Sequence, residues 1–304
     1  MGTLANAMRS LIQSSFLGWR AIVLHDSGLT LRIVPEVGGR LMSIQMDDCE
    51  MCFIHPTLQG RVFGGAEDQW KALCQDAAFP LWGGGKTWVA PESDWPMGAP
   101  HRDLDSLPWM VERSWINEVS MGVAVRSPVC SVSGLQIRRT LTLPAGRTDW
   151  TLDHELFNAS HRSVTCGMWD VLMLRRPAHV SLPGLAPSQI MPLPGKPSVS
   201  FLVESGVIIP TDGGSKIYCA KPAEFKCGFS TVGGRVQVAF DDMAVRYARS
   251  SAVPPSARYA HGHPFEVFNA PELPYFEVET HSPMQTLNPS DCIRYSIHEC
   301  VSRI

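Results

Sequence analysis

The segment Leu135-Gln136-Ile137-Arg138-Arg139-Thr140-Leu141-Thr142-Leu143 alternates apolar and polar side chains and stops at Pro144. A period of two is typical of a β-strand with one buried face, because successive side chains in a strand point to opposite faces. The proline then ends the run, since it cannot donate to a sheet hydrogen bond. This stretch predicts an antiparallel sheet that covers a core with one of its faces.

The same pattern recurs along the chain. Further strands are predicted at residues 29–35, 121–126, 151–157, 164–174, 236–240 and 275–280. The best helix candidate is short, at residues 67–75, and the 25 glycines and 24 prolines favour turns over long helices. Many half-buried strands need two packed sheets to cover their apolar faces, so we predict an all-β sandwich with few short helices.

Strands of one style continue through the chain without an evident linker, which predicts one domain. We place a single β-sandwich domain at residues 29–304 and an N-terminal extension at residues 1–28 that packs on it. Of the 304 residues, 44% are hydrophobic and 18% are charged. This composition is ordinary for a globular protein and supplies ample apolar material for a core.

Charge and cysteine content limit the expected partners and compartment. A net charge of −3 provides no basic field, so neither nucleic acid nor an anionic membrane surface is an expected partner. No apolar run reaches the ~18 residues that a membrane span needs. The first residues of the chain lack the continuous apolar run of a secretory signal. Nine scattered cysteines, an odd number, favour reduced thiols and a cytoplasmic location.

One pair of cysteines has the spacing of a metal or redox motif. Cys49 and Cys52 form a C-x-x-C pair, but a zinc ribbon needs a second pair at suitable spacing, and the sequence has none. We therefore predict two free thiols near a hairpin turn. Neither a cofactor nor a metal is predicted for the protein.

A first candidate for chemistry is the segment Pro35-Glu36-Val37-Gly38-Gly39-Arg40-Leu41. Two glycines allow a tight turn or a close approach of another group. Arg40 begins the next strand, and its planar guanidinium suits a carboxylate, a phosphate or sugar hydroxyls. The alternative is a hairpin turn with a solvated arginine.

A second candidate lies at residues 81–96, where three tryptophans, a lysine and two acids occur close together. Trp88 and Trp95 offer flat faces for the C–H face of a sugar, and Lys86 and the acids offer hydrogen bonds to hydroxyls. The glycines before Lys86 do not form a phosphate loop, because the Walker spacing needs a glycine where Pro80 stands. An ordered loop fixed by tryptophans is the alternative.

A third candidate is the predicted strand that begins at Tyr275. In a strand, Tyr275, Glu277, Glu279 and His281 share one face, while the residues between them share the other. Two acids and a histidine side by side can act as general base and general acid. An exposed polar face is the alternative, although neighbouring carboxylates on one face repel each other and are usually avoided.

The order of these motifs resembles a known superfamily. The Gly-Gly-Arg turn at residues 38–40, the Asn-x-Ser turn at residues 158–160 and the late Glu-rich strand ending near Pro283 resemble the aldose 1-epimerase, or galactose mutarotase-like, superfamily. The resemblance extends from Leu29 to Glu299. The Gly-Gly-x-Lys-x-Trp-x-Ala-Pro block is similar to an uncharacterised branch of that superfamily. The resemblance implies a β-supersandwich with a concave groove for a sugar.

The resemblance also implies roles for individual residues. In mutarotases a glutamate on the late strand removes the O1 proton, and a histidine after the Asn-x-Ser turn protonates the ring oxygen. The glutamate corresponds best to Glu279, with Glu277 as the competing assignment. The position expected for the histidine holds Trp169, with Asp170 beside it. A replacement acid is then needed, and His281, Asp170 and Lys86 are the candidates.

Together these features predict a ligand and three alternative functions. The resemblance places Arg40 and Lys86 at positions where the superfamily often has basic groove residues, which suggests an acidic or phosphorylated sugar, or a carboxylate ligand. Trp88, Trp95 and Trp169 are predicted to line the groove. We predict an anomerase or epimerase that acts on a sugar or an acidic sugar derivative by acid–base chemistry.

Two alternatives stay open. One is a non-catalytic carbohydrate-binding or sensing domain, which keeps the groove and lacks the acid. The other is a lyase or isomerase on the same scaffold, with His261, His263, Glu279 and His281 as metal ligands to test.

Overall fold

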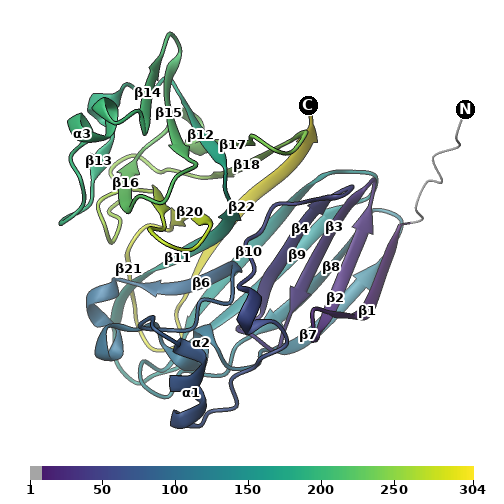
Figure 1. Cartoon of the computed structure of the whole chain (residues 1–304). Coiled ribbons are helices and arrows are strands. Elements are labelled where there is room, and N and C mark those ends of the chain that lie inside the picture. The colour runs from purple at the N-terminus through teal and green to yellow at the C-terminus, as the bar shows by residue number, and fades with distance from the viewer. Residues whose placement is uncertain (1–8) are drawn as a thin grey trace, which may run out of the picture.

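The computed structural model describes residues 9–304, and the strands in that range form two large antiparallel sheets (Figure 1). The larger sheet contains 12 strands in the part of the chain that is described. Its main path runs β1 (Ser10–Phe16), β2 (Trp19–Asp26), β3 (Leu29–Val34), β4 (Arg40–Met46), β6 (Gly84–Ala90), β11 (Val164–Arg175), β20 (Tyr275–His281), β19 (Phe265–Asn269), β16 (Phe225–Phe229) and β13 (Met191–Pro192). Two short strands, β5 (Cys49–Glu50) and β21 (Gln285–Leu287), pair with β4 and β11.

The second sheet contains 10 strands within residues 9–304. Its order is β14 (Ile208–Thr211), β15 (Gly214–Cys219), β12 (Ala178–Pro183), β17 (Arg235–Phe240), β18 (Val245–Ser251), β22 (Cys292–Arg303), β10 (Asp149–Asn158), β9 (Leu135–Pro144), β8 (Ser120–Arg126) and β7 (Met110–Ile116). The largest apolar cluster draws residues from both sheets, including Leu31, Leu141 and Leu172. The all-β sandwich that the alternating segments predict is therefore confirmed.

Local patterning explains the individual strands. β9 alternates buried and half-buried residues along its whole length, and its neighbour β10 alternates in the same way. Each of the strands predicted from the sequence is present, with ends that differ by at most two residues. These agreements arise because the period-two pattern and the Gly or Pro that ends it are local properties of the chain.

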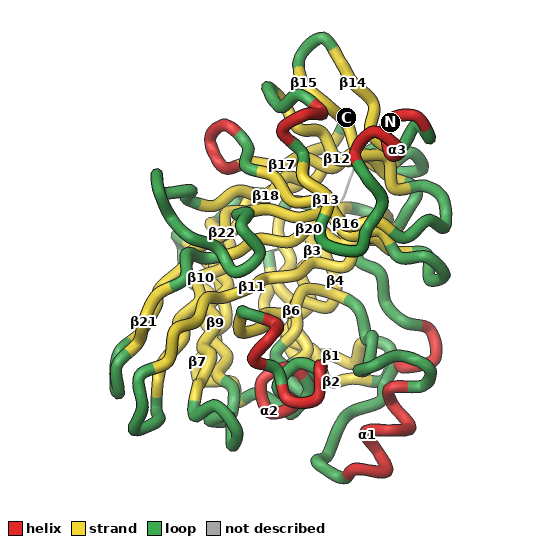
Figure 2. Tube along the Cα trace, turned by 90° about the vertical axis from the view of Figure 1, so that its left-hand side faces the viewer, coloured by secondary structure: helices red, strands yellow, loops and turns green. Residues whose placement is uncertain are grey.

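Helices are few and short and lie outside the sheets. The α-helices of residues 9–304 are α1 (Glu67–Cys74), α2 (Arg102–Asp105) and α3 (Val199–Glu204). α1 confirms the predicted helix at residues 67–75. Figures 1 and 2 place α1 and α2 near one end of the sheets and α3 near the other end. None of the helices in the described range has the length and apolar character that a membrane crossing requires.

The N-terminal region adds strands to the larger sheet. Residues 10–26 of the predicted extension form β1 and β2, and β2 pairs with β3 from Ile22↔Ile33 to Asp26↔Leu29. The first part of that extension, residues 1–8, lies outside the described residues. The division of the chain into an extension and one domain stays a prediction.

Candidate functional site

Three central strands of the larger sheet place the side chains of the site in register. β11 lies between β6 and β20, so that Trp169 pairs with Trp88 on one side and with His281 on the other. Two residues further along β11, Val171 pairs with Lys86 on β6 and with Glu279 on β20. Directly paired residues in a sheet point to the same face, so these six side chains share one face of the larger sheet.

The late strand has two faces of opposite character, as its sequence predicts. Phe276 and Val278 belong to the apolar core between the sheets. Glu277, Glu279 and His281 point to the other face, yet all seven residues of β20 are buried. The polar face is therefore covered by protein instead of facing water, and its charges need partners within the protein.

A cavity of about 780 Å³ lies over this face of the sheet. That volume falls within the roughly 300–1,000 Å³ typical of small-molecule sites. Trp88 packs edge-to-face against Trp95 and Trp169, with ring centroids 5.1 and 4.9 Å apart, and all three rings line the cavity. The charged and imidazole side chains that line it are Glu92, Lys196, Glu224, Lys226, His261 and Glu277. The combination of aromatic wall and convergent polar groups makes this cavity the candidate site.

A second cavity, of about 520 Å³, lies beside β1 and β2. Its charged lining residues are Arg20 and Glu36, which pair with each other at 2.7 Å. Arg20 is largely exposed, and this cavity lacks the cluster of buried titratable groups found in the first. We therefore treat the cavity over β6, β11 and β20 as the functional candidate.

Glu277 lines the candidate cavity and is held by a buried lysine. Nζ of Lys86 lies 3.2 Å from Oε1 of Glu277 and 4.2 Å from the ring centroid of Trp88. Burial lowers the pKa of Lys86, and the charge of Glu277 offsets part of that shift. The structure thus brings Glu277 together with the lysine and tryptophan of the segment at residues 81–96.

Lys226, on β16, binds two further carboxylates. Its Nζ lies 2.9 Å from Oε2 of Glu279 and 3.0 Å from Oε2 of Glu266. Burial opposes the charge of Lys226, but the two carboxylates outweigh it and raise its pKa. The indole Nε1 of Trp169 donates to Oε2 of Glu279 at 2.6 Å. Burial raises the pKa of Glu279 to about 8, against the opposing charge of Lys226.

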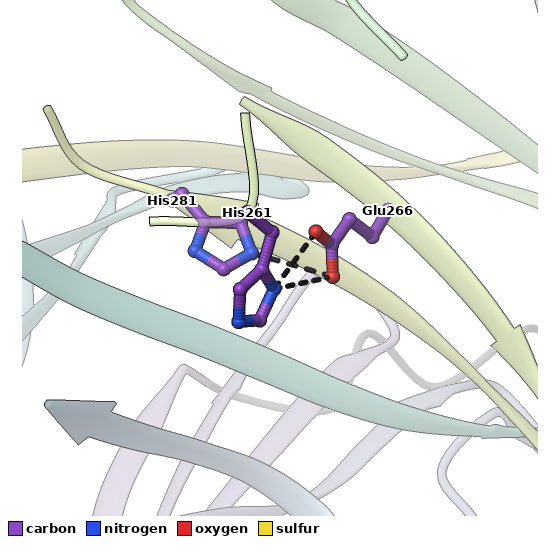
Figure 3. Close-up of side chains that lie close together, drawn as sticks. All are labelled: His261, Glu266 and His281. Atoms are coloured by element: carbon purple, nitrogen blue, oxygen red, sulfur yellow. Dashed lines mark hydrogen bonds and ion pairs between the residues drawn. The ribbon is translucent and has the colours of Figure 1, made fainter. Parts of the chain in front are cut away.

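Two histidines lie next to each other beside the carboxylate of Glu266, as Figure 3 shows. Nδ1 of His261 lies 2.9 Å from Oε1 of Glu266, and Nε2 of His281 lies 3.5 Å from its Oε2. The second distance is in ion-pair range without the geometry of a hydrogen bond, and within residues 9–304 neither ring nitrogen of His281 has a hydrogen-bond partner. Burial lowers the pKa of His281. For Glu266, burial raises the pKa, but the hydrogen bond from His261, the nearby His281 and the charge of Lys226 hold it well below its usual range.

Lys86, Glu279 and His281, which are predicted for the site, lie on the cavity face of the sheet but are not among the residues that line the cavity. Two further predicted residues lie elsewhere. Arg40 is buried in an ion pair with Asp105, at 2.8 Å, and does not line the cavity. Asp170 follows Trp169 in β11 and therefore points to the opposite face, where Oδ2 accepts hydrogen bonds from Thr87 and contacts His154. Both side chains are committed to structural contacts, so we leave them out of the functional proposal.

Sequence reasoning missed Lys226 and Glu266 and considered His261 only as a metal ligand. Lys226 stands in the short run Phe225-Lys226-Cys227-Gly228-Phe229, and Glu266 stands between Phe265 and Val267. A charged residue inside an otherwise apolar strand is a signal that could have identified both, because such a residue needs a partner when the strand is buried.

No protein-family model matches the sequence, and no curated protein matches it. Solved structures do match. A galactose mutarotase-like protein from Clostridium acetobutylicum has 10% sequence identity and a TM-score of 0.61, over 97% of this chain and 99% of that chain. A galactose mutarotase-like protein from Lactobacillus casei has 9% identity and a TM-score of 0.59, over 93% of this chain and 100% of that chain.

The chain has the galactose mutarotase-like fold. The resemblance in fold inferred from the motifs is therefore confirmed. A galactose mutarotase related enzyme from Lactobacillus acidophilus is similar over 93% of this chain, with 10% identity and a TM-score of 0.54. At such low identity the likeness concerns the fold, and function has to be argued from the residues of the site.

Proposed function

We propose that this protein binds a sugar in the 780 Å³ cavity and interconverts its anomers by proton transfer. The observation that carries the proposal is that a carboxylate, Glu277, and an imidazole, His261, line one aromatic-walled cavity. The flat faces of Trp88, Trp95 and Trp169 suit the C–H face of a sugar ring, because an aromatic ring offers a large apolar surface of fixed shape. The carbohydrate-related fold supports the same class of ligand.

The charges of the cavity favour a neutral sugar over an acidic one. Lys226 binds two carboxylates, and Lys196 pairs with Glu224. Lys86 pairs with Glu277. Each lysine at the cavity is thus neutralised within the described protein, and a ligand carboxylate or phosphate would have to displace one of these partners. The acidic sugar that the sequence suggests becomes the less favoured ligand in this proposal.

In the proposed reaction, Glu277 takes the proton from the anomeric hydroxyl, and His261 gives a proton to the ring oxygen. The C1–O5 bond then breaks to give the open aldehyde, rotation about C1–C2 turns the carbonyl, and closure returns both protons. Oε1 of Glu266 accepts a hydrogen bond from Nδ1 of His261 at 2.9 Å and so orients the imidazole. This leaves Nε2 as the ring nitrogen for the sugar, and acid–base catalysis of this kind supplies ~10²–10⁴-fold.

A non-catalytic sugar-binding protein is the second candidate. It is favoured by the indole of Trp169 at the position where the resemblance places an acid histidine, with its Nε1 already bonded to Glu279. Glu277 is likewise engaged by Lys86 before any ligand enters. A cavity built this way can bind a sugar without a free acid.

The test separates binding from turnover. A thermal-shift screen against neutral sugars, uronic acids and sugar phosphates identifies ligands, because binding to the folded state raises the melting temperature. Magnetisation-exchange NMR on each hit then measures anomer interconversion with wild type, Glu277→Gln and Glu272→Gln, the last an exposed carboxylate in the loop before β20.

We expect neutral sugars to bind and Glu277→Gln to slow enzyme-dependent exchange by ~10²–10⁴-fold, while Glu272→Gln leaves it unchanged. A bound sugar whose anomers exchange no faster with the wild-type protein than in buffer would reject the anomerase and support the binding protein. Hits confined to uronic acids or sugar phosphates would reject the neutral ligand.

A further inference from the structure

We propose that His261, Glu266 and His281 (Figure 3) form a binding site for one divalent transition-metal ion next to the cavity, which His261 lines. One ligand atom from each residue can be chosen so that all of them lie within 4.8 Å of one another. The three residues come from the loop before β19, from β19 itself and from the end of β20. β19 and β20 are paired strands, which fixes the positions of Glu266 and His281.

The separations suit a shared ion. Two ligand atoms bound to one zinc ion at 2.0–2.1 Å are about 2.8–3.4 Å apart in octahedral to tetrahedral geometry. Oε2 of Glu266 lies 3.2 Å from Nδ1 of His261 and 3.5 Å from Nε2 of His281. The third separation, between the two imidazoles, is at most 4.8 Å. His261 is half-buried and belongs to a loop, so a small rotation of its side chain can shorten the distance between the two imidazoles to the range that a shared ion needs.

A second observation that points to a ligand at this place is the lack of hydrogen-bond partners, among the described residues, for the buried imidazole of His281. His281 is 1% exposed, and within residues 9–304 neither of its ring nitrogens makes a hydrogen bond. Leaving a buried polar group unpaired destabilises a protein, and buried polar atoms almost always have a partner or a bound ion or water. An ion on Nε2 would give this nitrogen a closer partner than Oε2 of Glu266, which lies 3.5 Å away.

The donor set selects the class of metal. Two imidazoles and one carboxylate favour zinc or ferrous iron, whereas magnesium and calcium prefer oxygen ligands. The indole of Trp169 packs against both imidazoles, at centroid distances of 4.8 Å from His261 and 5.4 Å from His281. Such outer contacts orient the first ligands of a metal.

Lys226 is compatible with the ion. It lies 3.0 Å from Oε2 of Glu266, and it also has Glu279 at 2.9 Å as a second partner. When Oε2 of Glu266 binds the ion, Lys226 keeps Glu279 as its carboxylate partner. Metal bound at Nδ1 of His261 would leave a proton on its Nε2, so this histidine would still offer the cavity a hydrogen-bond donor.

The experiment measures metal binding in the absence of sugar, so that its result is independent of the proposed anomer exchange. Full-length protein is stripped with a chelator and titrated with Zn²⁺ by calorimetry, and with Fe²⁺ under anaerobic conditions. Co²⁺ serves as a spectroscopic probe through its visible absorption. Each titration is repeated with His281→Gln, Glu266→Gln and, as a matched control, His263→Gln, since His263 stands in the same loop outside the cluster.

We expect one ion per wild-type chain, a loss of affinity of at least 100-fold in His281→Gln and Glu266→Gln, and no change in His263→Gln. Zn²⁺ should also raise the melting temperature of wild type and the control, which keeps the test valid if a ligand variant is poorly folded. Absence of stoichiometric binding of all three ions to wild type, or equal affinity in folded His281→Gln, would overturn the site.

Discussion

Replacing Asp170 by asparagine tests whether this residue stabilises the sandwich or serves the chemistry. Its carboxylate lies between the two sheets and is 1% exposed. One oxygen pairs with Arg249, and the other lies 2.8 Å from Oγ1 of Thr87 and 3.0 Å from Nε2 of His154. The substitution keeps the shape of the side chain and removes its charge. Arg249 then keeps Glu299, at 3.1 Å, as its remaining carboxylate partner.

The magnitude follows from this geometry. Breaking a buried ion pair by removing one partner costs about 3–5 kcal/mol, because the other charge stays buried. Since Arg249 retains Glu299, we expect Asp170→Asn to lower the free energy of unfolding by about 3 kcal/mol. For a chain of this length that corresponds to a fall in melting temperature of about 5 °C. Anomer exchange at 25 °C should stay near the wild-type rate.

The pH dependence gives a second measure of the same charge. Burial raises the pKa of Asp170, but the charge of Arg249 and the hydrogen bond from His154 outweigh it and hold this pKa well below its usual range. An aspartate in the unfolded chain titrates near about 3.9. Ionised Asp170 therefore stabilises the fold above that pH, and its contribution is lost as the pH falls further. The stability difference between wild type and Asp170→Asn should shrink below about pH 4.

The assay is denaturant unfolding and calorimetry across pH 3–7, with Asp149→Asn as the control. Asp149 is an exposed aspartate whose partner, Arg147, is also exposed, and such pairs contribute about 0–1 kcal/mol. A stability loss below about 1 kcal/mol for Asp170→Asn would refute the structural role. A hundredfold loss of anomer exchange in a variant that remains folded would instead place Asp170 at the chemistry, as the sequence suggests.

Two further substitutions, one of them with a matched glycine control, test the turn at Gly38 and the aromatic wall of the cavity. Gly38 has φ +57°, and a Cβ there would lie 1.9 Å from the carbonyl oxygen of Asp105, so Gly38→Ala should cost at least about 3 kcal/mol of stability. Gly146→Ala has a similar φ, +70°, and free space, so denaturant unfolding should show a cost of only about 1–2 kcal/mol. Trp95→Ala removes a ring stacked 5.5 Å from Trp169, and calorimetry should show sugar affinity falling by ~5–30-fold, or about 1–2 kcal/mol. Unchanged affinity would mean that the sugar binds elsewhere.

The strands of this fold could be predicted from the sequence because each one carries its own pattern. The alternating residues 135–143 become β9, and residues 164–174 become β11. The pairing of strands is different, since β11 lies between β6 and β20, which are far from it and from each other in the chain. Nothing in a local pattern specifies such long-range neighbours.

For the candidate site, too, the local relations within one strand could be predicted and the relations between distant strands could not. The alternation of β20 correctly assigns Glu277, Glu279 and His281 to one face, since a strand alone fixes that relation. The same rule, applied to β11, places Asp170 and Trp169 on opposite faces, so Asp170 could have been excluded from the site by its position next to Trp169. Lys226 and Glu266 could not be joined to the site without knowing that β16 and β19 follow β20 in the sheet.

The two faces of β11 have different roles: residues on the core face bind the second sheet, and Trp169 on the other face lines the cavity. The position of the cavity residues depends on the contacts of the core face. On the core face, Asp170 binds Arg249 on β18, which fixes β11 relative to the second sheet. On the cavity face, Trp169 follows at a position set by the same backbone, and there its Nε1 meets Glu279 on β20. A slip of β11 by one residue would exchange these faces, burying an indole among charges and placing a carboxylate beside Glu279. The ion pairs between the sheets therefore stabilise the register on which the cavity depends, although none of them touches it.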